Sequence, residues 1–429
     1  MSADTASNEH YILPEQLCIG LYVHLDLSWT EHPFTFSSFK IKSLDQVATI
    51  QGLSLKRVRY SPSKSDSKPL PAPKPSDTPP PPPPPPLPRS EDPVFQAKQA
   101  RMKRLEAQRI KSAACEKELL SAAKTIKSIN QNIFSRPEEV KAEAGTLIKT
   151  IADSMLVDAD VSIQLMADKV GGEDVYYHSL NVSLLSMMLA KELKAPAPVV
   201  QMVGMGALFH DIGELEIPDR IVRKQEALTK AEAALMQMHC EYGVNIAKRM
   251  NLPNEVLQVI AQHHERVDGS GYPNGVTAAQ MSLLSRIVSL VNAYDKYCNP
   301  ANPAKAMTPH EALSMMFAQQ RNQFDQLAMS TFVRCMGVYP PGTIVVLSNG
   351  AMAMVVSVNT TKPLRPVVLV YDPSVPKEEA IVVDLEVEQD VSVTKTMRPQ
   401  QLSSDAHAYL SPRKRMTYYF DTESGKVGS

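Results

Sequence analysis

The feature that most constrains this chain is an adjacent histidine and aspartate, His210 and Asp211, inside the segment GALFHDIGELEIP. The pair stands where a mostly apolar segment meets a glycine, a pattern typical of a helix end. There, an imidazole and a carboxylate can face one cavity and offer nitrogen and oxygen ligands to a divalent transition metal. A single dipeptide of this kind is more often a surface accident than a site, so the interpretation depends on further ligands.

Histidines supply those further ligands. Five of the ten histidines in the chain lie between residues 178 and 264, each in a segment with helical patterning: His178, His210, His239, His263 and His264. Histidine combined with carboxylate suits iron, manganese or zinc better than calcium. The sequence therefore predicts a mainly α-helical domain built around a metal site.

The same positions belong to a longer ordered pattern. It comprises Tyr177-His178-Ser179, His210-Asp211-Ile212-Gly213, Ile217-Pro218, His239 and the block HHERVDGSGYP from His263 to Pro273. This order resembles the HD-GYP family, a branch of the HD phosphohydrolases whose characterised members hydrolyse the bacterial second messenger cyclic di-GMP. The resemblance covers roughly residues 140 to 335 and implies an all-helical HD-type metal-binding domain.

The resemblance also implies a centre of two divalent ions, iron or manganese, with His210 and Asp211 as the catalytic pair. Asp211 is the natural bridging ligand because a carboxylate has two oxygens. The five histidines are then terminal ligands. Asp174 lies one helical turn before His178 and is a candidate ligand for a third ion, with a solvated loop acid as the alternative.

A second group of positions is predicted to bind substrate: Asn181, Lys224, Gly271, Tyr272 and Pro273. Asn181 and Lys224 match positions that the family usually fills in the same way, and a lysine can counter a phosphate charge. Glycines let the backbone approach a ligand closely, and Tyr272 can donate a hydrogen bond or stack. A purely structural turn is the alternative for this loop.

Three departures from the family pattern bear on activity. Glu214 stands where the family has a lysine, and two unit charges about 4 Å apart interact by about 4 kcal/mol at an effective dielectric of about 20. Attraction for a phosphate would then become repulsion, although Glu214, one turn from Asp211, is also a candidate metal ligand. A second departure is the segment CNPANP, residues 298 to 303, which replaces an arginine-containing segment expected to hold phosphate.

The remaining departure is Asn292, which stands where an aspartate of the family normally completes the metal site. A neutral amide oxygen is a weaker ligand, so Asn292 is a candidate ligand that leaves one ion less well compensated. Asp295 lies three residues further on, and we expect its side chain to leave the helix in another direction.

Two classes of function follow. The first is a metal-dependent phosphodiesterase that hydrolyses cyclic di-GMP to pGpG or GMP. The alternative is a degenerate domain that acts as a cyclic di-GMP sensor or protein-interaction module, or a hydrolase of another nucleotide. Retention of the histidines and Asp211 favours the enzyme, whereas Glu214 and Asn292 favour the sensor.

Composition divides the chain into six parts. Fifteen of its 34 prolines fall between Pro62 and Pro93, and such a run forms an extended spacer rather than a core. The predicted parts are a small β-rich N-terminal module (9–61), the proline-rich linker (62–93), a basic and amphipathic helical segment (94–136), the HD-GYP domain (137–336), a C-terminal antiparallel β extension (337–400) and a tail (401–429). The first part resembles an uncharacterised module that often precedes HD-GYP domains.

Charge and cysteine usage bound the partners and the compartment. A net charge of −1 argues against nucleic-acid binding, and no apolar run is long enough to predict a membrane span. The N-terminal residues show no basic-then-apolar leader, so no signal peptide is predicted. Five scattered cysteines fit reduced thiols in the cytoplasm. An apolar stripe in the 94–133 helix, comprising Leu119, Ala123, Ile126, Ile129 and Ile133, would pack on the next domain or form a homodimer.

Overall fold

A computed structural model of the chain describes residues 10–27, 32–34, 36–53, 55–72, 117–157, 163–165, 174–358, 362–373, 375–377, 380–410 and 418–420, together with residues 103, 106 and 110. The chain divides into two compact units. The first comprises residues 1–108, 348–351 and 371–383, and the second comprises the remainder. The predicted linker lies largely outside the described residues.

The N-terminal part folds as a four-stranded antiparallel sheet with one helix. The strands are β1 (His10–Ile12), β2 (Tyr22–His24), β3 (Ser38–Lys40) and β4 (Val58–Tyr60), in the order β1-β4-β2-β3. Helix α1 (Leu44–Gly52) begins at Ser43, whose side chain accepts the Gln46 amide, as an N-cap does. The β-rich prediction is confirmed, but β3 and α1 were not predicted because neither segment has a long apolar run.

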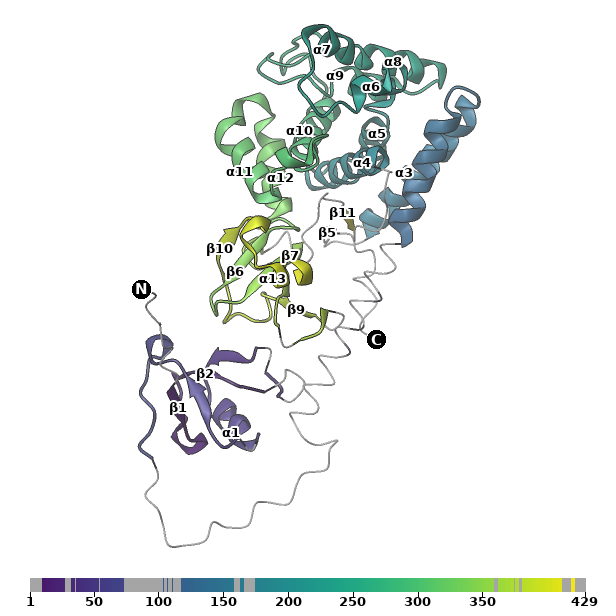
Figure 1. The fold of residues 1–429 in the computed structure, drawn as a ribbon. Coiled ribbons are helices and arrows are strands. Elements are labelled where there is room, and N and C mark those ends of the chain that lie inside the picture. The colour runs from purple at the N-terminus through teal and green to yellow at the C-terminus, as the bar shows by residue number, and fades with distance from the viewer. Residues whose placement is uncertain are drawn as a thin grey trace. The chain divides into compact units, whose positions relative to one another are not determined.

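Residues 137 to 336 form the helical part that carries the histidines (Figure 1). Its α-helices are α3 (Pro137–Val157), α4 (Asp174–Glu192), α5 (Ala197–Leu208), α6 (Asp219–Val222), α7 (Lys230–Gln237), α8 (His239–Arg249), α9 (Asn254–Gln262), α10 (Leu283–Cys298), α11 (Pro309–Gln319) and α12 (Gln326–Met336). A short 3-10 helix, η3 (Ile212–Glu216), follows the His-Asp pair. The mainly α-helical prediction is therefore confirmed.

Helix α4 lies at the centre of this part and contacts α5 and α10. Its residues from Leu180 to Ala190 are all buried, so it is apolar nearly all round rather than amphipathic. Gly204 of α5 allows the close approach, because a Cβ there would lie 2.5 Å from the sulfur of Met187. This tight packing gives the histidine-bearing helix a rigid base.

The apolar stripe of the basic and amphipathic segment is buried within a single chain. Residues 117–132 are helical, and none of the five stripe residues is more than 3% exposed. The stripe is therefore already covered within one chain. A homodimer through residues 94–133 stays a prediction.

A second antiparallel sheet forms in the C-terminal part. It contains β6 (Ile344–Leu347), β7 (Met352–Val358), β8 (Val367–Val370), β9 (Ile381–Asp384) and β10 (Val393–Met397), which all lie in the predicted β extension, together with β5 (Ile163–Leu165) and β11 (Tyr418–Phe420). The order is β10-β6-β7-β5-β11, and β8 also pairs with β7. Gly350, between β6 and β7, has a φ of +87°.

Three elements of this region were not predicted. Strand β5 (Ile163–Leu165) comes from the segment expected to be helical, whereas β11 (Tyr418–Phe420) and α13 (Ser404–Leu410) come from the predicted tail. Strand β5 pairs with both β7 and β11. These pairings join distant segments, which periodicity within one segment cannot anticipate.

Across the described residues, no helix combines the length and the apolar character that a membrane span requires.

Candidate metal centre

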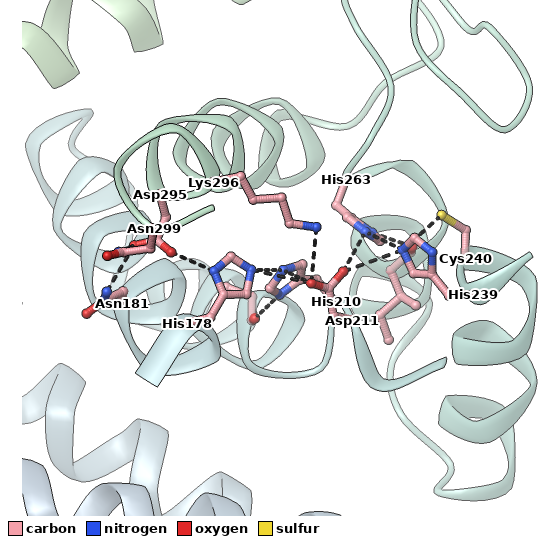
Figure 2. Close-up of polar contacts among 12 residues, drawn as sticks. His178, Asn181, His210, Asp211, His239, Cys240, His263, Asp295, Lys296 and Asn299 are labelled. Atoms are coloured by element: carbon pink, nitrogen blue, oxygen red, sulfur yellow. Dashed lines mark hydrogen bonds and ion pairs between the residues drawn. The ribbon is translucent and has the colours of Figure 1, made fainter. Parts of the chain in front are cut away.

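Asp211 lies at the middle of a buried cluster of imidazoles (Figure 2). Its Oδ2 atom is 3.3 Å from Nε2 of His178 and 3.2 Å from Nε2 of His210. Its Oδ1 atom is 3.4 Å from Nε2 of His239 and 3.2 Å from Nε2 of His263. The two carboxylate oxygens therefore face two different groups of histidines.

Each group has the composition of a metal site. His178, His210 and Asp211 form one, and Asp211, His239, His263 and His264 form the other, with the ligand atoms in each group within 4.8 Å of one another. All six side chains predicted as the core ligands thus converge, from α4, the end of α5, α8 and the end of α9.

The far side of each ring determines which nitrogen faces the cluster. Nδ1 of His210 donates to the Ala207 carbonyl at 2.6 Å, and Nδ1 of His263 donates to the Ile260 carbonyl at 2.8 Å. His239 contacts the Met236 carbonyl in the same way. Because a carbonyl only accepts, Nδ1 carries the proton, and Nε2 is the atom presented to the cluster.

The inward nitrogens meet in pairs. Nε2 of His178 lies 3.1 Å from Nε2 of His210, and Nε2 of His239 lies 3.0 Å from Nε2 of His263. Two ring nitrogens at this distance must share a cation, which is either a proton or a metal ion. Buried Oδ1 of Asp211 and Nε2 of His264 have no hydrogen-bond partner. The donor set therefore fits divalent metal ions.

Two glycines allow the ligand-bearing helices to close on Asp211. A Cβ at Gly213 would overlap the backbone carbonyl of His239, which starts α8. A Cβ at Gly206 would lie 2.8 Å from side-chain carbons of Val259, on α9. The glycine of the HDIG motif is thus explained by close packing of η3 on α8.

Burial disfavours a charge on every ring, and the neighbouring groups decide which rings keep a proton. Burial lowers the pKa of His178, but hydrogen bonds to Asp211 and Asp295 outweigh it and raise the pKa to about 9. The pKa of His239 is raised to about 10, because contacts with Asp211 and Cys240 outweigh burial. Burial lowers the pKa of His263 to about 3 and also lowers the pKa of His210. Each facing pair therefore combines one protonated and one neutral ring when no metal is bound.

Asp295 orients His178 through the outer ring nitrogen, Nδ1, and belongs to neither ligand group. Oδ2 of Asp295 lies 2.6 Å from Nδ1 of His178, and Oδ1 accepts hydrogen bonds from Asn181 and Asn299, both at 2.9 Å. Asn181, predicted to bind substrate, lies buried behind this carboxylate.

Lys296 is the residue of the cluster that the sequence reasoning missed. Its Nζ lies 3.3 Å from Oδ2 of Asp211. Burial lowers its pKa, but the carboxylates of Asp211 and Glu214 outweigh burial, so the pKa lies above its ordinary value. The helical spacing could have indicated this residue, because Lys296 lies four residues after Asn292 and so shares its helix face.

Three further candidate ligands were predicted, namely Glu214, Asn292 and Asp174. Burial and the charge of Asp211 raise the pKa of Glu214 to about 7. Asn292 is buried, and its Oδ1 has no hydrogen-bond partner. Asp174 begins α4, but its side chain lies outside the described residues. The metal-ligand roles of these three residues stay predictions.

The predicted substrate loop packs against the cluster through its tyrosine. The Tyr272 ring stacks on His264, with 4.4 Å between centroids and 19° between planes. Pro273 follows a cis peptide bond. A Cβ at Gly271 would lie 2.5 Å from backbone atoms of Glu265 and Arg266, which is the structural role left open for this loop. Tyr272 thus braces one of the metal-site histidines.

Two further residues discussed for this region are Lys224 and Cys240. Lys224, predicted to bind substrate, forms an ion pair with Glu232 at 2.6 Å, and its role stays a prediction. Cys240 is buried, with Sγ 3.6 Å from Nε2 of His239. The thiol therefore borders the Oδ1 side of the cluster.

Three protein families match the chain by sequence. These are the HD domain over residues 155–327, the domain of unknown function DUF3391 over residues 11–144, and the KOW domain associated with HD domain over residues 344–405. Residues 155–327 therefore belong to the HD domain family. The N-terminal module and the C-terminal β unit that the sequence indicated are matched as well, so the resemblance drawn from the motifs is confirmed.

The chain is also similar to several named phosphodiesterases. It is 33% identical over 231 residues to a cyclic di-GMP phosphodiesterase of Pseudomonas aeruginosa, covering 54% of this chain and 56% of the relative. It is 34% identical over 151 residues to a cyclic di-GMP phosphodiesterase of Thermotoga maritima, covering 33% and 40%. It is 30% identical over 154 residues to 3'3'-cGAMP-specific phosphodiesterase 1 of Vibrio cholerae, covering 35% and 36%. The chain spans about half the length, or less, of these curated relatives.

Proposed function

We propose that this protein is a metal-dependent phosphodiesterase that hydrolyses cyclic di-GMP to pGpG or GMP. The observation that carries the proposal is the pair of facing ring nitrogens on each side of Asp211. Such an arrangement offers ligand atoms in two places that share one carboxylate. The sensor alternative is less well supported, because all six core ligands converge in one cluster.

The residues of the chain would act as holders and orienters. His178, His210 and Oδ2 of Asp211 would hold one ion, and His239, His263 and Oδ1 of Asp211 would hold another, with His264 beside them. Bound divalent ions would acidify a water molecule and neutralise phosphate charge. Asp295 keeps the His178 ring turned toward the cluster, and Tyr272 does the same for His264.

Imidazole and carboxylate ligands favour iron or manganese here over calcium. Two ions are proposed because Asp211 faces two ligand groups, and a third would require Asp174. A cytoplasmic location stays part of the proposal and agrees with the free thiols of the described residues Cys18, Cys240, Cys298 and Cys335. Cyclic di-GMP is the proposed partner, and no nucleic acid is expected.

The direct test is turnover of cyclic di-GMP by protein purified without oxygen and loaded with Fe²⁺ or Mn²⁺. Products are separated by chromatography, which distinguishes pGpG from GMP. We expect turnover in the native protein and none in the double variant His210→Ala with Asp211→Ala. Elemental analysis of the same samples should show that the double variant loses its bound metal.

The matched control is His407→Ala, which removes an exposed histidine of α13. This variant should keep both turnover and metal. Native protein that holds metal and binds cyclic di-GMP without hydrolysing it would contradict the proposal and favour the sensor.

The substrate assignment has one specific competitor. A relative 30% identical to this chain is named for 3'3'-cGAMP, another cyclic dinucleotide. Ratios of kcat/KM for cyclic di-GMP and 3'3'-cGAMP, measured with the same metal-loaded protein, decide between them. A higher value for 3'3'-cGAMP would keep the reaction class and reject the substrate.

A further inference from the structure

One cationic side chain reaches the metal cluster from a helix that supplies none of the core ligands. Lys296 extends from α10 to Asp211, as Figure 2 shows, and its Nζ lies 3.3 Å from Oδ2. Within the described residues, no other lysine or arginine forms an ion pair with Asp211. The Lys296 side chain is 40% exposed, whereas Asp211 is 7% exposed. The lysine therefore connects a buried carboxylate with the open side of the cluster.

The contact with Asp211 leaves most of the donor capacity of Lys296 unused. An ammonium group has three N–H donors, and one carboxylate oxygen occupies one of them. Its four-carbon stem is flexible, so the charged end can move between partners without a change in the backbone. The side chain is therefore suited to hold a second anion next to Oδ2.

The pairing with Asp211 also competes with metal. Both oxygens of Asp211 face histidine groups that fit divalent ions. Once those oxygens coordinate divalent ions, Asp211 no longer needs an ammonium partner. The positive charges of the ions then repel the Lys296 ammonium group. A position for Lys296 close to the cluster is then favourable only if an anion lies between them.

We propose that Lys296 binds the phosphate of the substrate, exchanging Oδ2 of Asp211 for a non-bridging phosphate oxygen when the cluster is loaded with metal. The ligand class is a phosphodiester or phosphomonoester, as in a cyclic dinucleotide and its linear product. The proposal rests on the proposed function for the identity of the nucleotide. The lysine thereby supplies a cation next to Glu214, where the sequence led us to expect repulsion of phosphate.

The test compares Lys296→Met, which removes the charge, with Lys296→Arg, which keeps it. Lys305→Met is the matched control, because Lys305 is an exposed lysine in the short 3-10 helix after α10. Manganese-loaded proteins are titrated calorimetrically with pGpG, which needs no turnover to bind, and with inorganic phosphate. Steady-state kinetics with cyclic di-GMP supplies KM and kcat, and circular dichroism checks folding.

We expect Lys296→Met to weaken pGpG binding and to raise KM by about tenfold or more, the effect of losing a hydrogen bond between charged groups. Lys296→Arg should stay within about threefold of the native protein, because the charge is kept although the shape differs. Manganese content should be unchanged in both variants, and Lys305→Met should match the native protein in every measurement.

Three results would overturn the proposal. Equal pGpG and phosphate affinity in the native and Lys296→Met proteins would show that the lysine only neutralises Asp211. Loss of manganese together with binding in Lys296→Met would assign it to the metal site instead. Native protein that binds neither probe would leave Lys296 without an anion to hold.

The two proposals can fail separately. Native protein without turnover of cyclic di-GMP rejects the proposed function. The role of Lys296 still stands in that case if the Met variant weakens pGpG or phosphate binding and the Arg variant restores it.

Discussion

The two sides of Asp211 differ in burial and in charge. The Oδ1 side, with His239, His263 and His264, is buried, and His264 is braced by Tyr272. The Oδ2 side, with His178 and His210, is more open, because the His178 side chain is 16% exposed and Lys296 enters there. If the cluster binds ions as proposed, we expect the Oδ1 side to hold metal more firmly and the Oδ2 side to admit substrate and solvent.

The largest effect should follow from removing the carboxylate that both sides share. Asp211→Asn keeps the shape of the side chain but replaces a bridging anion with a neutral amide. We expect loss of bound metal on both sides and a fall in turnover of at least about a thousandfold, since metal supplies the nucleophile and the charge neutralisation. Elemental analysis and turnover measure this, and retention of two ions per chain would show that Asp211 is not the bridge.

The next effect should separate the two sides. His239→Ala removes a ligand from the buried side, and His178→Ala removes one from the open side. We expect His239→Ala to lose the more firmly held ion, whereas His178→Ala should keep about one ion per chain because the Oδ1 group remains intact. Competition with a chelator, followed by elemental analysis, measures both. Equal losses of metal in the two variants would show that the Oδ1 and Oδ2 sides do not differ in metal affinity.

Metal affinity should rise with pH. Metal binding requires the protons of His178 and His239 to leave, and the pKa values of these rings are raised to about 9 and about 10. Affinity should therefore increase from pH 6 to pH 8, by up to about tenfold per unit for each proton displaced. Titration with Mn²⁺ at several pH values measures this.

Without metal, stability should change in the opposite direction. A raised pKa in the folded state means that the stabilisation from His178 and His239 is complete below their ordinary value of 6.5 and is lost as the pH rises through about 9 and about 10. Thermal melts of chelated protein at pH 6 and pH 9.5 test the sign. Greater stability at the higher pH would contradict the assigned protonation.

The smallest effect should follow from changing what orients His178. Asp295→Asn keeps the size of the side chain but weakens its contact with Nδ1 of His178. We expect a loss of metal affinity of about tenfold, confined to the Oδ2 side, as for other groups that orient a metal ligand. Asn181→Ala should give a smaller loss, because Asn181 donates to Asp295 and so lies one step further from the His178 ring. Loss of the ion on the Oδ1 side in either variant would show that the two sides are not independent.

Several parts of this molecule were predictable because their patterns are local. Helical patterning around the five histidines predicted the helical class of this domain, and the C-terminal β extension was predicted over the residues where β6 to β10 lie. The ligand types of His178, His210, Asp211, His239, His263 and His264 were readable because metal chemistry limits which side chains can serve. Their convergence was inferred from the motif order, not from any one segment.

Local patterns could not decide which distant groups meet. Strand β5 forms only because β7 and β11 supply hydrogen-bond partners, and Asp295 became a partner of His178 because α10 packs against α4. Which oxygen of Asp211 faces which histidines, and whether Lys296 reaches the cluster, depends on the packing of several helices on one another. The sequence by itself determined the candidate metal ligands and the helical class of the domain, because residue chemistry and periodicity are properties of short segments. Only the tertiary structure decided the two sides of Asp211, because a side chain acquires its partners, its burial and its pKa from residues that are remote along the chain.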